Sequence, residues 1–125
     1  MKIYISSSCE NREAVKTLRR ILINDGHEIT FDWTIHEDAP ESPAQATQWA
    51  MEDVTGVLKA DLMLFITPGR RGAHVELGIG IAMRRPIFIL GKYYDNIFYR
   101  YPTITMFEDL FEMLEAIEEM QRSLS

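Results

Sequence analysis

The chain has 125 residues, with 13 Lys plus Arg against 19 Asp plus Glu, which gives a formal net charge of −6. This acidic balance argues against binding to a nucleic acid polymer, because counterion release needs a stripe of basic side chains. No apolar run approaches the roughly 20 residues that a membrane helix requires, and we expect neither a membrane segment nor a signal peptide. Cys9 is the only cysteine, so an internal disulfide is excluded and a reducing, cytoplasmic location is expected.

The first half of the chain alternates between strand-like and helix-like segments. Residues 2–6 predict a short buried strand that runs into serines, and the apolar residues behind it have helical spacing up to Gly26, a typical helix end. Residues 27–33 (HEITFDW) predict a second strand, because they are rich in β-branched and aromatic residues. Residues 34–42 predict a polar loop, and residues 43–59 a second helix.

The second half continues this alternation. The apolar run 61–67 (DLMLFIT) predicts a central parallel strand that is covered on both faces. Residues 73–83 predict a helix of small residues, residues 86–90 a strand, residues 103–107 a weaker strand, and the chain then predicts a helix to about residue 122. This last helix should present one apolar face, made of Phe107, Leu110, Phe111, Leu114 and Ile117.

Strands that alternate with helices predict an α/β fold. We expect a single doubly wound (Rossmann/flavodoxin-like) domain over residues 1–125, with a mostly parallel five-stranded sheet flanked by helices. In such sheets, ligands bind beyond the carboxyl ends of the strands. The loops that follow the strands are therefore where a functional site is expected.

Glu76 interrupts an otherwise apolar helix that follows the central strand. One interpretation is a first-turn glutamate that the helix dipole favours, which would contribute roughly 0.3–1 kcal/mol. The other is a buried carboxylate beside a strand-end cleft, which is a candidate nucleophile or acid/base group. The sequence alone supports both interpretations about equally.

Asp53 falls within the apolar stripe of the second helix, which runs through Ala46, Trp49, Ala50, Val54 and Val57. The simpler interpretation is a residue at the edge of the stripe that reaches solvent. Two inward carboxylates in one small domain, however, would supply the groups for displacement at a sugar carbon, one as the attacking group and one to transfer protons.

The turn between the central strand and Glu76 is suited to an anion. Gly69 and Gly72 flank Arg70 and Arg71 at the start of a helix, where backbone N–H groups and a guanidinium could hold a phosphate. The alternative is a solvated turn. The segment lacks the patterns of a P-loop or a dinucleotide fingerprint, which disfavours nucleoside triphosphate hydrolysis and NAD-dependent redox chemistry.

The serines after the first strand are a second candidate for substrate binding. Ser6, Ser7 and Ser8 could bind phosphate or sugar hydroxyls, although serines also commonly begin helices. The three histidines form no metal-binding pattern, so we expect neither a metal nor an organic cofactor.

Three segments resemble the nucleoside 2-deoxyribosyltransferase superfamily, which includes the 2'-deoxynucleoside 5'-monophosphate N-glycosidases. They are IYI at residues 3–5, DVTGVLKAD at residues 53–61 and GAHVELG at residues 72–78. The resemblance implies that Glu76 is a nucleophile that forms a glycosyl-enzyme, that Tyr4 positions it, and that Asp53 transfers the proton of the leaving base. It also implies that Asn96 reaches the sugar in a neighbouring subunit's site, in a homo-oligomer with shared sites.

Arg70 departs from this family's pattern. Six residues before the nucleophile the transferases carry an aspartate that binds the 5'-hydroxyl, and the monophosphate hydrolases carry a serine that faces the phosphate. An arginine there would attract a 5'-phosphate. The spacing of residues 68–76 also resembles the motif of cytokinin-activating phosphoribohydrolases, with Arg70 and Ala73 in place of a glycine and a threonine.

The leading hypothesis is an N-glycosidase that hydrolyses the base–sugar bond of a (deoxy)nucleoside 5'-monophosphate through a glutamyl glycosyl-enzyme. The partner would be a small nucleotide or nucleoside. One alternative is a nucleoside 2-deoxyribosyltransferase that exchanges bases, and another is a non-catalytic nucleotide sensor. The sequence leaves the base, and ribose against 2'-deoxyribose, open.

Overall fold

In the computed structural model, which describes residues 1–92 and 96–124, five strands form one parallel sheet. They are β1 (Lys2–Ser6), β2 (Glu28–Ile29), β3 (Leu62–Ile66), β4 (Ile87–Leu90) and β5 (Ile104–Phe107). Their order, β2-β1-β3-β4-β5, is that of a flavodoxin-like doubly wound sheet. The α/β fold and the central place of the apolar strand β3 are therefore confirmed.

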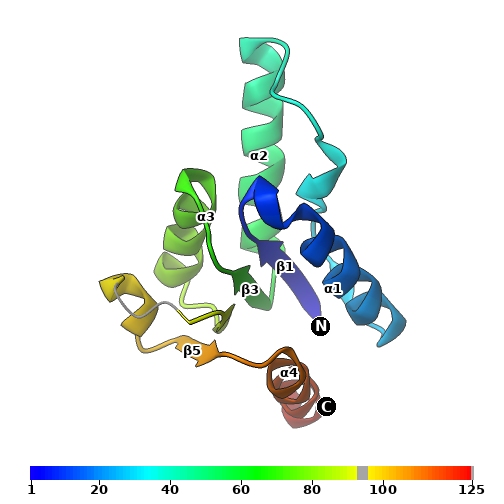
Figure 1. Cartoon of the computed structure of the whole chain (residues 1–125), viewed down its shortest axis with the longest axis vertical. Coiled ribbons are helices and arrows are strands. Elements are labelled where there is room, and N and C mark those ends of the chain that lie inside the picture. The colour runs from blue at the N-terminus through cyan, green and yellow to red at the C-terminus, as the bar shows by residue number, and fades with distance from the viewer. Residues whose placement is uncertain (93–95, 125) are drawn as a thin grey trace.

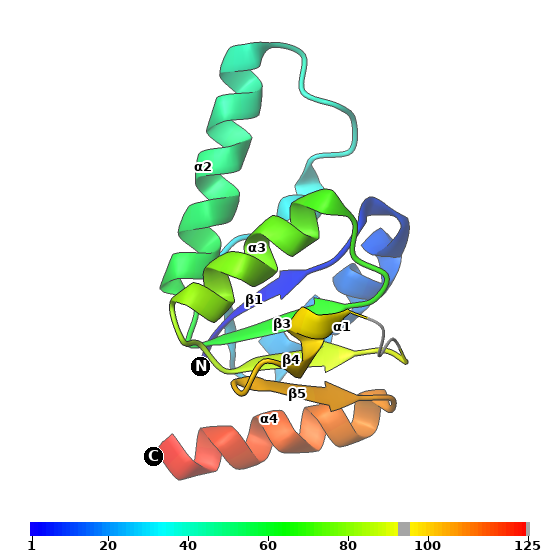
Figure 2. The ribbon, with the colours of Figure 1, turned by 90° about the vertical axis from the view of Figure 1, so that its left-hand side faces the viewer.

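Four helices cover the two faces of the sheet (Figures 1 and 2). The helices α1 (Arg12–Asn24) and α4 (Leu110–Leu124) pack on one face, and α2 (Pro43–Lys59) and α3 (Arg71–Ala82) on the other. Short 3₁₀ turns, η1 (Cys9–Asn11), η2 (Trp33–Ile35) and η3 (Ile97–Arg100), lie in the connections. No helix within the described residues has the length and apolar composition to cross a membrane.

The two-residue period of β1 decides which side chains meet which helices. Ile3 and Ile5 belong to the core under α1 and α4, whereas Tyr4 belongs to the core under α2 and α3. Ser6 follows Tyr4 by two residues and so points to the same face. This alternation brings two hydroxyl groups from β1 to the side of α3.

The second strand is much shorter than expected. Only Glu28–Ile29 pair with β1, where residues 27–33 were expected to form a strand. The chain leaves the sheet because Asp32 turns back to cap η2, accepting hydrogen bonds from the backbone N–H and the hydroxyl of Thr34. The indole N–H of Trp33 then donates to the carbonyl of Ile5 over 2.7 Å.

Two helices differ in detail from the expectation. The helix α3 begins at Arg71, two residues earlier than expected, so Gly72 lies in its first turn. In α4, Phe111 is 75% exposed, although its position on the apolar face was expected to bury it. Met113 and Ile117, four residues apart on the same side, are the buried residues of that helix.

The first half of α2 extends well beyond the sheet (Figures 1 and 2). Ser42 caps this helix by accepting a hydrogen bond from the N–H of Gln45. Only Gly56 and Val57 are buried, so the expected stripe does not pack against the core along its whole length. The protruding part instead carries Trp49 alongside the loop that follows η2, and Asp53 lies four residues later in the same helix.

Candidate active site

Glu76 is the carboxylate on which the site is built. It lies in α3 on the side that packs against the sheet, and only 9% of its surface is exposed. The Tyr4 hydroxyl donates to its Oε2 over 2.8 Å, and the Ser6 hydroxyl donates to its Oε1 over 2.6 Å. Each oxygen therefore has a fixed donor, and the carboxylate is held in one orientation at the end of β1.

Gly56 makes room for the tyrosine. A Cβ at this position of α2 would lie 2.8 Å from Cε1 of Tyr4 and 2.9 Å from the Cβ of Phe31. Both separations are shorter than side chains tolerate. The ring of Tyr4 can reach Glu76 only because α2 presents bare backbone here.

The surroundings of Glu76 change its acidity. Burial raises the pKa of Glu76 to about 7, even though the hydrogen bonds from Ser6 and Tyr4 act to lower it, and the charge of Asp53 adds to the rise. The pKa of Tyr4 is also raised, mainly by burial and then by the nearby carboxylates. Tyr4 therefore stays protonated and keeps donating its hydrogen bond.

Asp53 is the second carboxylate. It is half-buried on α2, and its Oδ1 is enclosed without a hydrogen-bond partner among the described residues. Burial raises the pKa of Asp53 to about 6, with the charge of His36 opposing the rise and that of Glu52 adding to it. An unpaired buried carboxylate oxygen of this kind can take a proton or a donor from a ligand.

Both carboxylates open onto one cleft of about 490 Å³. The rings of His36 and Trp49 form part of its wall, and they stack with their centroids 3.9 Å apart. Arg12, from the start of α1, is the arginine that borders it. The residues that line the cleft are Ser7, Cys9, Arg12, Trp33, His36, Glu37, Asp38, Ala39, Pro40, Trp49, Asp53, Gly72 and Glu76.

The three serines have different places. Ser6 is fully buried, and its hydroxyl donates to Glu76, which is a position for orienting the carboxylate. Ser7 borders the cleft, and its hydroxyl donates to the carbonyl of Ile66. The Ser8 hydroxyl bonds to Glu10 and to the carbonyl of Pro68, outside the cleft lining.

Residues 69–72 form the turn before Glu76, and only part of this turn lines the cleft. Gly72 lines it, but neither Arg70 nor Arg71 does. Arg70 forms an ion pair with Glu10, in which Nη2 and Oε1 lie 2.7 Å apart, and Arg71 is exposed. Gly69 approaches Phe65 so closely that a side chain at this position would collide with its ring.

Asn96 lies apart from this cleft. Its side-chain oxygen accepts from the N–H of Phe98 at the start of η3. With His74, Asn96 lines a different cavity, of about 520 Å³, on the other side of α3. Within one subunit, Asn96 therefore does not contribute to the site around Glu76.

Sequence reasoning named Ser6 but missed its contact with Glu76, and it missed Arg12 and Gly56 altogether. The two-residue period of β1 is a signal that could have placed Ser6 beside Tyr4. Arg12 and Gly56 gave no such signal, since their roles depend on the packing of separate elements.

Within the described residues, no group of His, Cys, Asp and Glu side chains could hold a metal ion.

Comparisons with known proteins show similarity at the level of structure. No family model and no curated protein sequence matches the chain. The chain is similar to the CMP N-glycosidase BcmB of Clostridium botulinum, with a TM-score of 0.62 and 20% identity over 96% of this chain and 99% of that one. It is also similar to a 2-deoxyribosyltransferase of Bacillus psychrosaccharolyticus, with a TM-score of 0.72 and 21% identity over 90% of each chain. The chain therefore has the fold of nucleoside 2-deoxyribosyltransferase-like proteins, as its sequence motifs had implied.

Proposed function

We propose that this protein is an N-glycosidase that hydrolyses the base–sugar bond of a nucleoside 5'-monophosphate. The observation that carries the proposal is the buried carboxylate of Glu76, which two hydroxyl groups orient beside a cleft that it shares with Asp53. The names of the two structural neighbours, a CMP N-glycosidase and a 2-deoxyribosyltransferase, support the same class of reaction.

The first step is displacement of the base by Glu76. An oxygen of the carboxylate forms a bond to C1' of the sugar while the C1'–N bond breaks, and the bonding electrons leave with the base. Asp53 protonates the departing base. With a pKa of about 6, this carboxyl is protonated more often near neutral pH than an ordinary aspartate would be.

The second step is hydrolysis of the glycosyl ester. The Asp53 carboxylate takes a proton from water, the water oxygen attacks C1', and the Glu76 carboxylate leaves. Each turnover therefore consumes one water molecule and releases the base and the sugar 5-phosphate. Two displacements at C1' retain its configuration. Tyr4 and Ser6 act by holding Glu76 in line with C1'.

The start of α3 is the place for the 5'-phosphate. Gly72 and Ser7 border the cleft there, and the first N–H groups of a helix lack carbonyl partners and favour an anion. Arg70 and Arg71 flank this turn. The Arg70–Glu10 pair is exposed, with 70% and 48% of the side chains accessible, and such pairs contribute little, so a phosphate can compete with Glu10 for Arg70.

The experiment that tests this proposal measures base release. Purified protein is incubated with ribo- and deoxyribonucleoside monophosphates and with the free nucleosides, and the products are separated by chromatography. We expect release from one or more monophosphates and loss of that release in Glu76→Ala. Glu112→Ala, which removes an exposed carboxylate from α4, is the matched control and should keep the activity.

Each other outcome contradicts a defined part of the proposal. Release from free nucleosides alone would contradict the phosphate assignment. A new nucleoside formed on addition of an acceptor base would indicate transfer in place of hydrolysis. Release that persists in Glu76→Ala would exclude Glu76 as the nucleophile, and no release from any substrate would overturn the N-glycosidase function.

A further inference from the structure

One wall of the cleft is formed by the loop that connects η2 to α2. We call residues 34–40 the wall loop. It runs from η2 toward α2, beside the protruding half of that helix (Figure 2). Residues 36–40 all line the cleft. The shape of the substrate site therefore depends on where this loop is held.

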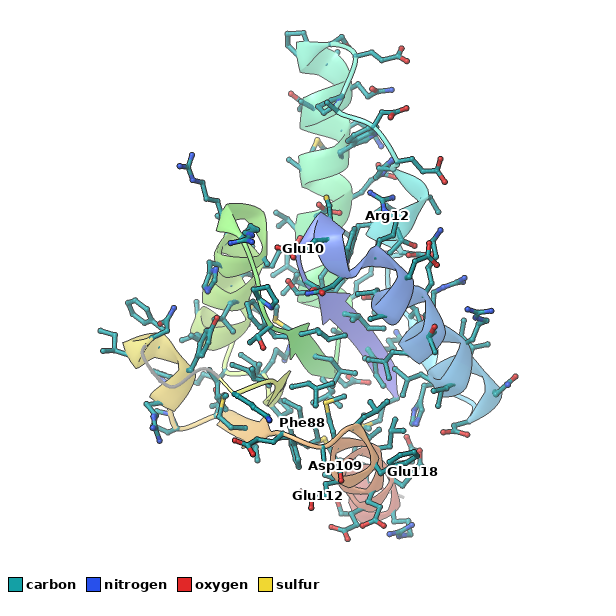
Figure 3. The ribbon with its side chains drawn as sticks, viewed as in Figure 1. Glu10, Arg12, Phe88, Asp109, Glu112 and Glu118 are labelled. Carbon is teal, nitrogen blue, oxygen red and sulfur yellow. The ribbon has the colours of Figure 1, made fainter. Side chains whose placement is uncertain are left out.

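Arg12, the first residue of α1, holds the backbone of the wall loop. Its Nη1 donates to the carbonyl oxygens of Thr34 and His36, both over 2.8 Å. The guanidinium also lies 5.9 Å from the ring centroid of Trp33. Figure 3 shows Arg12 at the end of α1 that faces this loop. A single side chain thus joins α1 to two carbonyl groups of the loop backbone.

Few other hydrogen bonds among the described residues fix this segment. The loop begins at Thr34, which Asp32 caps, and His36 donates its N–H to the carbonyl of Trp33. Beyond His36, the next backbone hydrogen bond within the described residues is that of Glu41 to the side chain of Gln45. The stretch that lines the cleft therefore depends on its anchor at His36.

The loop also carries a contact to the helix of Asp53. The ring of His36 stacks on Trp49 of α2 with centroids 3.9 Å apart, and its Nε2 lies 3.8 Å from Oε1 of Glu52. Because Arg12 holds the backbone of His36, it also holds the ring that meets α2. Arg12 is thus connected, through two contacts, to the helix that presents Asp53 to the cleft.

We propose that Arg12 is a positioning residue that fixes the wall loop and the His36–Trp49 stack, so that the cleft has its binding shape before substrate enters. The kinetic part of this inference rests on the proposed function. Without Arg12 the loop must be ordered during binding, and this cost should appear in the KM for the substrate and much less in kcat.

The kinetic test compares three variants. We expect Arg12→Met to raise KM about tenfold or more, since two hydrogen bonds from a charged donor are lost, while kcat changes less than about threefold. Arg12→Lys keeps the charge and should recover part of the loss. Arg20→Met is the matched control, because Arg20 also lies on α1 but is exposed and does not line the cleft.

A second test needs no activity. The chain has two tryptophans, and Trp33→Phe leaves Trp49 as the only one. In that background we expect Arg12→Met to shift Trp49 emission to longer wavelength and to speed hydrogen exchange in residues 34–40, whereas Arg20→Met does neither. These measurements decide the inference even if the wild type releases no base.

Three results would overturn the inference. The first is a kcat/KM for Arg12→Met within twofold of the wild-type value. The second is a raised KM with unchanged Trp49 emission, which would make Arg12 a direct contact of the substrate. The third is an equal effect of Arg20→Met, which would indicate a general loss of stability.

Discussion

Replacing Tyr4 by Phe removes one of the two hydroxyl groups that donate hydrogen bonds to Glu76, and it leaves the aromatic ring in place. That hydroxyl donates to Oε2 over 2.8 Å, and the bond lowers the pKa of Glu76, which burial raises to about 7. A hydrogen bond to a charged group contributes about 1.5–3 kcal/mol, and about 1.4 kcal/mol corresponds to one pH unit. We therefore expect the titration midpoint of Glu76 to rise from near pH 7 by about one to two pH units.

The rate should follow the ionised fraction of the nucleophile. At pH 7 such a rise lowers the ionised fraction of Glu76 by about five- to fiftyfold, and base release should fall at least as much. The assay is an NMR titration of the labelled glutamate carboxyl carbons, with the signal of Glu76 assigned from its loss in Glu76→Gln. This measurement reports on Glu76 directly and does not require turnover.

Tyr99→Phe is the matched control for this titration. Tyr99 is a buried tyrosine on the same face of the sheet, and its hydroxyl meets Nε2 of His74 at 2.9 Å, not Glu76. Its removal should leave the midpoint of Glu76 where it is. A midpoint that stays near pH 7 or falls in Tyr4→Phe would refute the argument, as would an equal rise in Tyr99→Phe.

Two further predictions concern stability. The pKa of Glu76 is raised in the folded state from 4.5 to about 7, so its favourable contribution is complete below pH 4.5 and is lost, by about 3 kcal/mol at most, as the pH rises to 7. Glu76→Gln should therefore resist urea better than the wild type at pH 8 and equally well at pH 4.5. The same difference in unfolding free energy between variant and wild type at both pH values would contradict this. Gly56→Ala should lose about 1–3 kcal/mol in urea unfolding, together with activity, because the new methyl group would lie 2.8 Å from the ring of Tyr4. Gly78→Ala, with open space around it, is the control and should gain up to about 1 kcal/mol, so equal stabilities of the two variants would exclude the packing argument.

The sequence identified residues that contradict their local pattern. Glu76 stood out as a charge in an apolar helix, and Asp53 as a carboxylate among apolar positions; the structure places both on one cleft. The apolar run of β3 likewise predicted the centre of the sheet correctly. Tyr4 gave no signal of its own, because a tyrosine in a strand is an ordinary core residue, and only the resemblance to a family drew attention to it.

Other parts of the site depend on contacts that no local pattern encodes. Arg12 binds carbonyl oxygens 22 and 24 residues away, and a carbonyl carries no mark of residue type. Gly56 matters because the ring of Tyr4 crosses α2 at that point, which depends on how two elements pack. Arg70 was the more prominent arginine in the sequence, but Glu10, 60 residues away, pairs with it.

The acidities of the two carboxylates explain why Glu76 needs two hydroxyl donors. Burial raises the pKa of Glu76 to about 7 and that of Asp53 to about 6, so either carboxylate can hold a proton near neutral pH. The proposed first step needs one of these two arrangements, with Glu76 ionised and Asp53 protonated. The hydrogen bonds from Tyr4 and Ser6 stabilise only the ionised form of Glu76, and so they shift the proton toward Asp53. A base that covers the unpaired Oδ1 of Asp53 removes it further from water and shifts the proton in the same direction. The two hydroxyl groups and the substrate therefore act together to produce the reactive state.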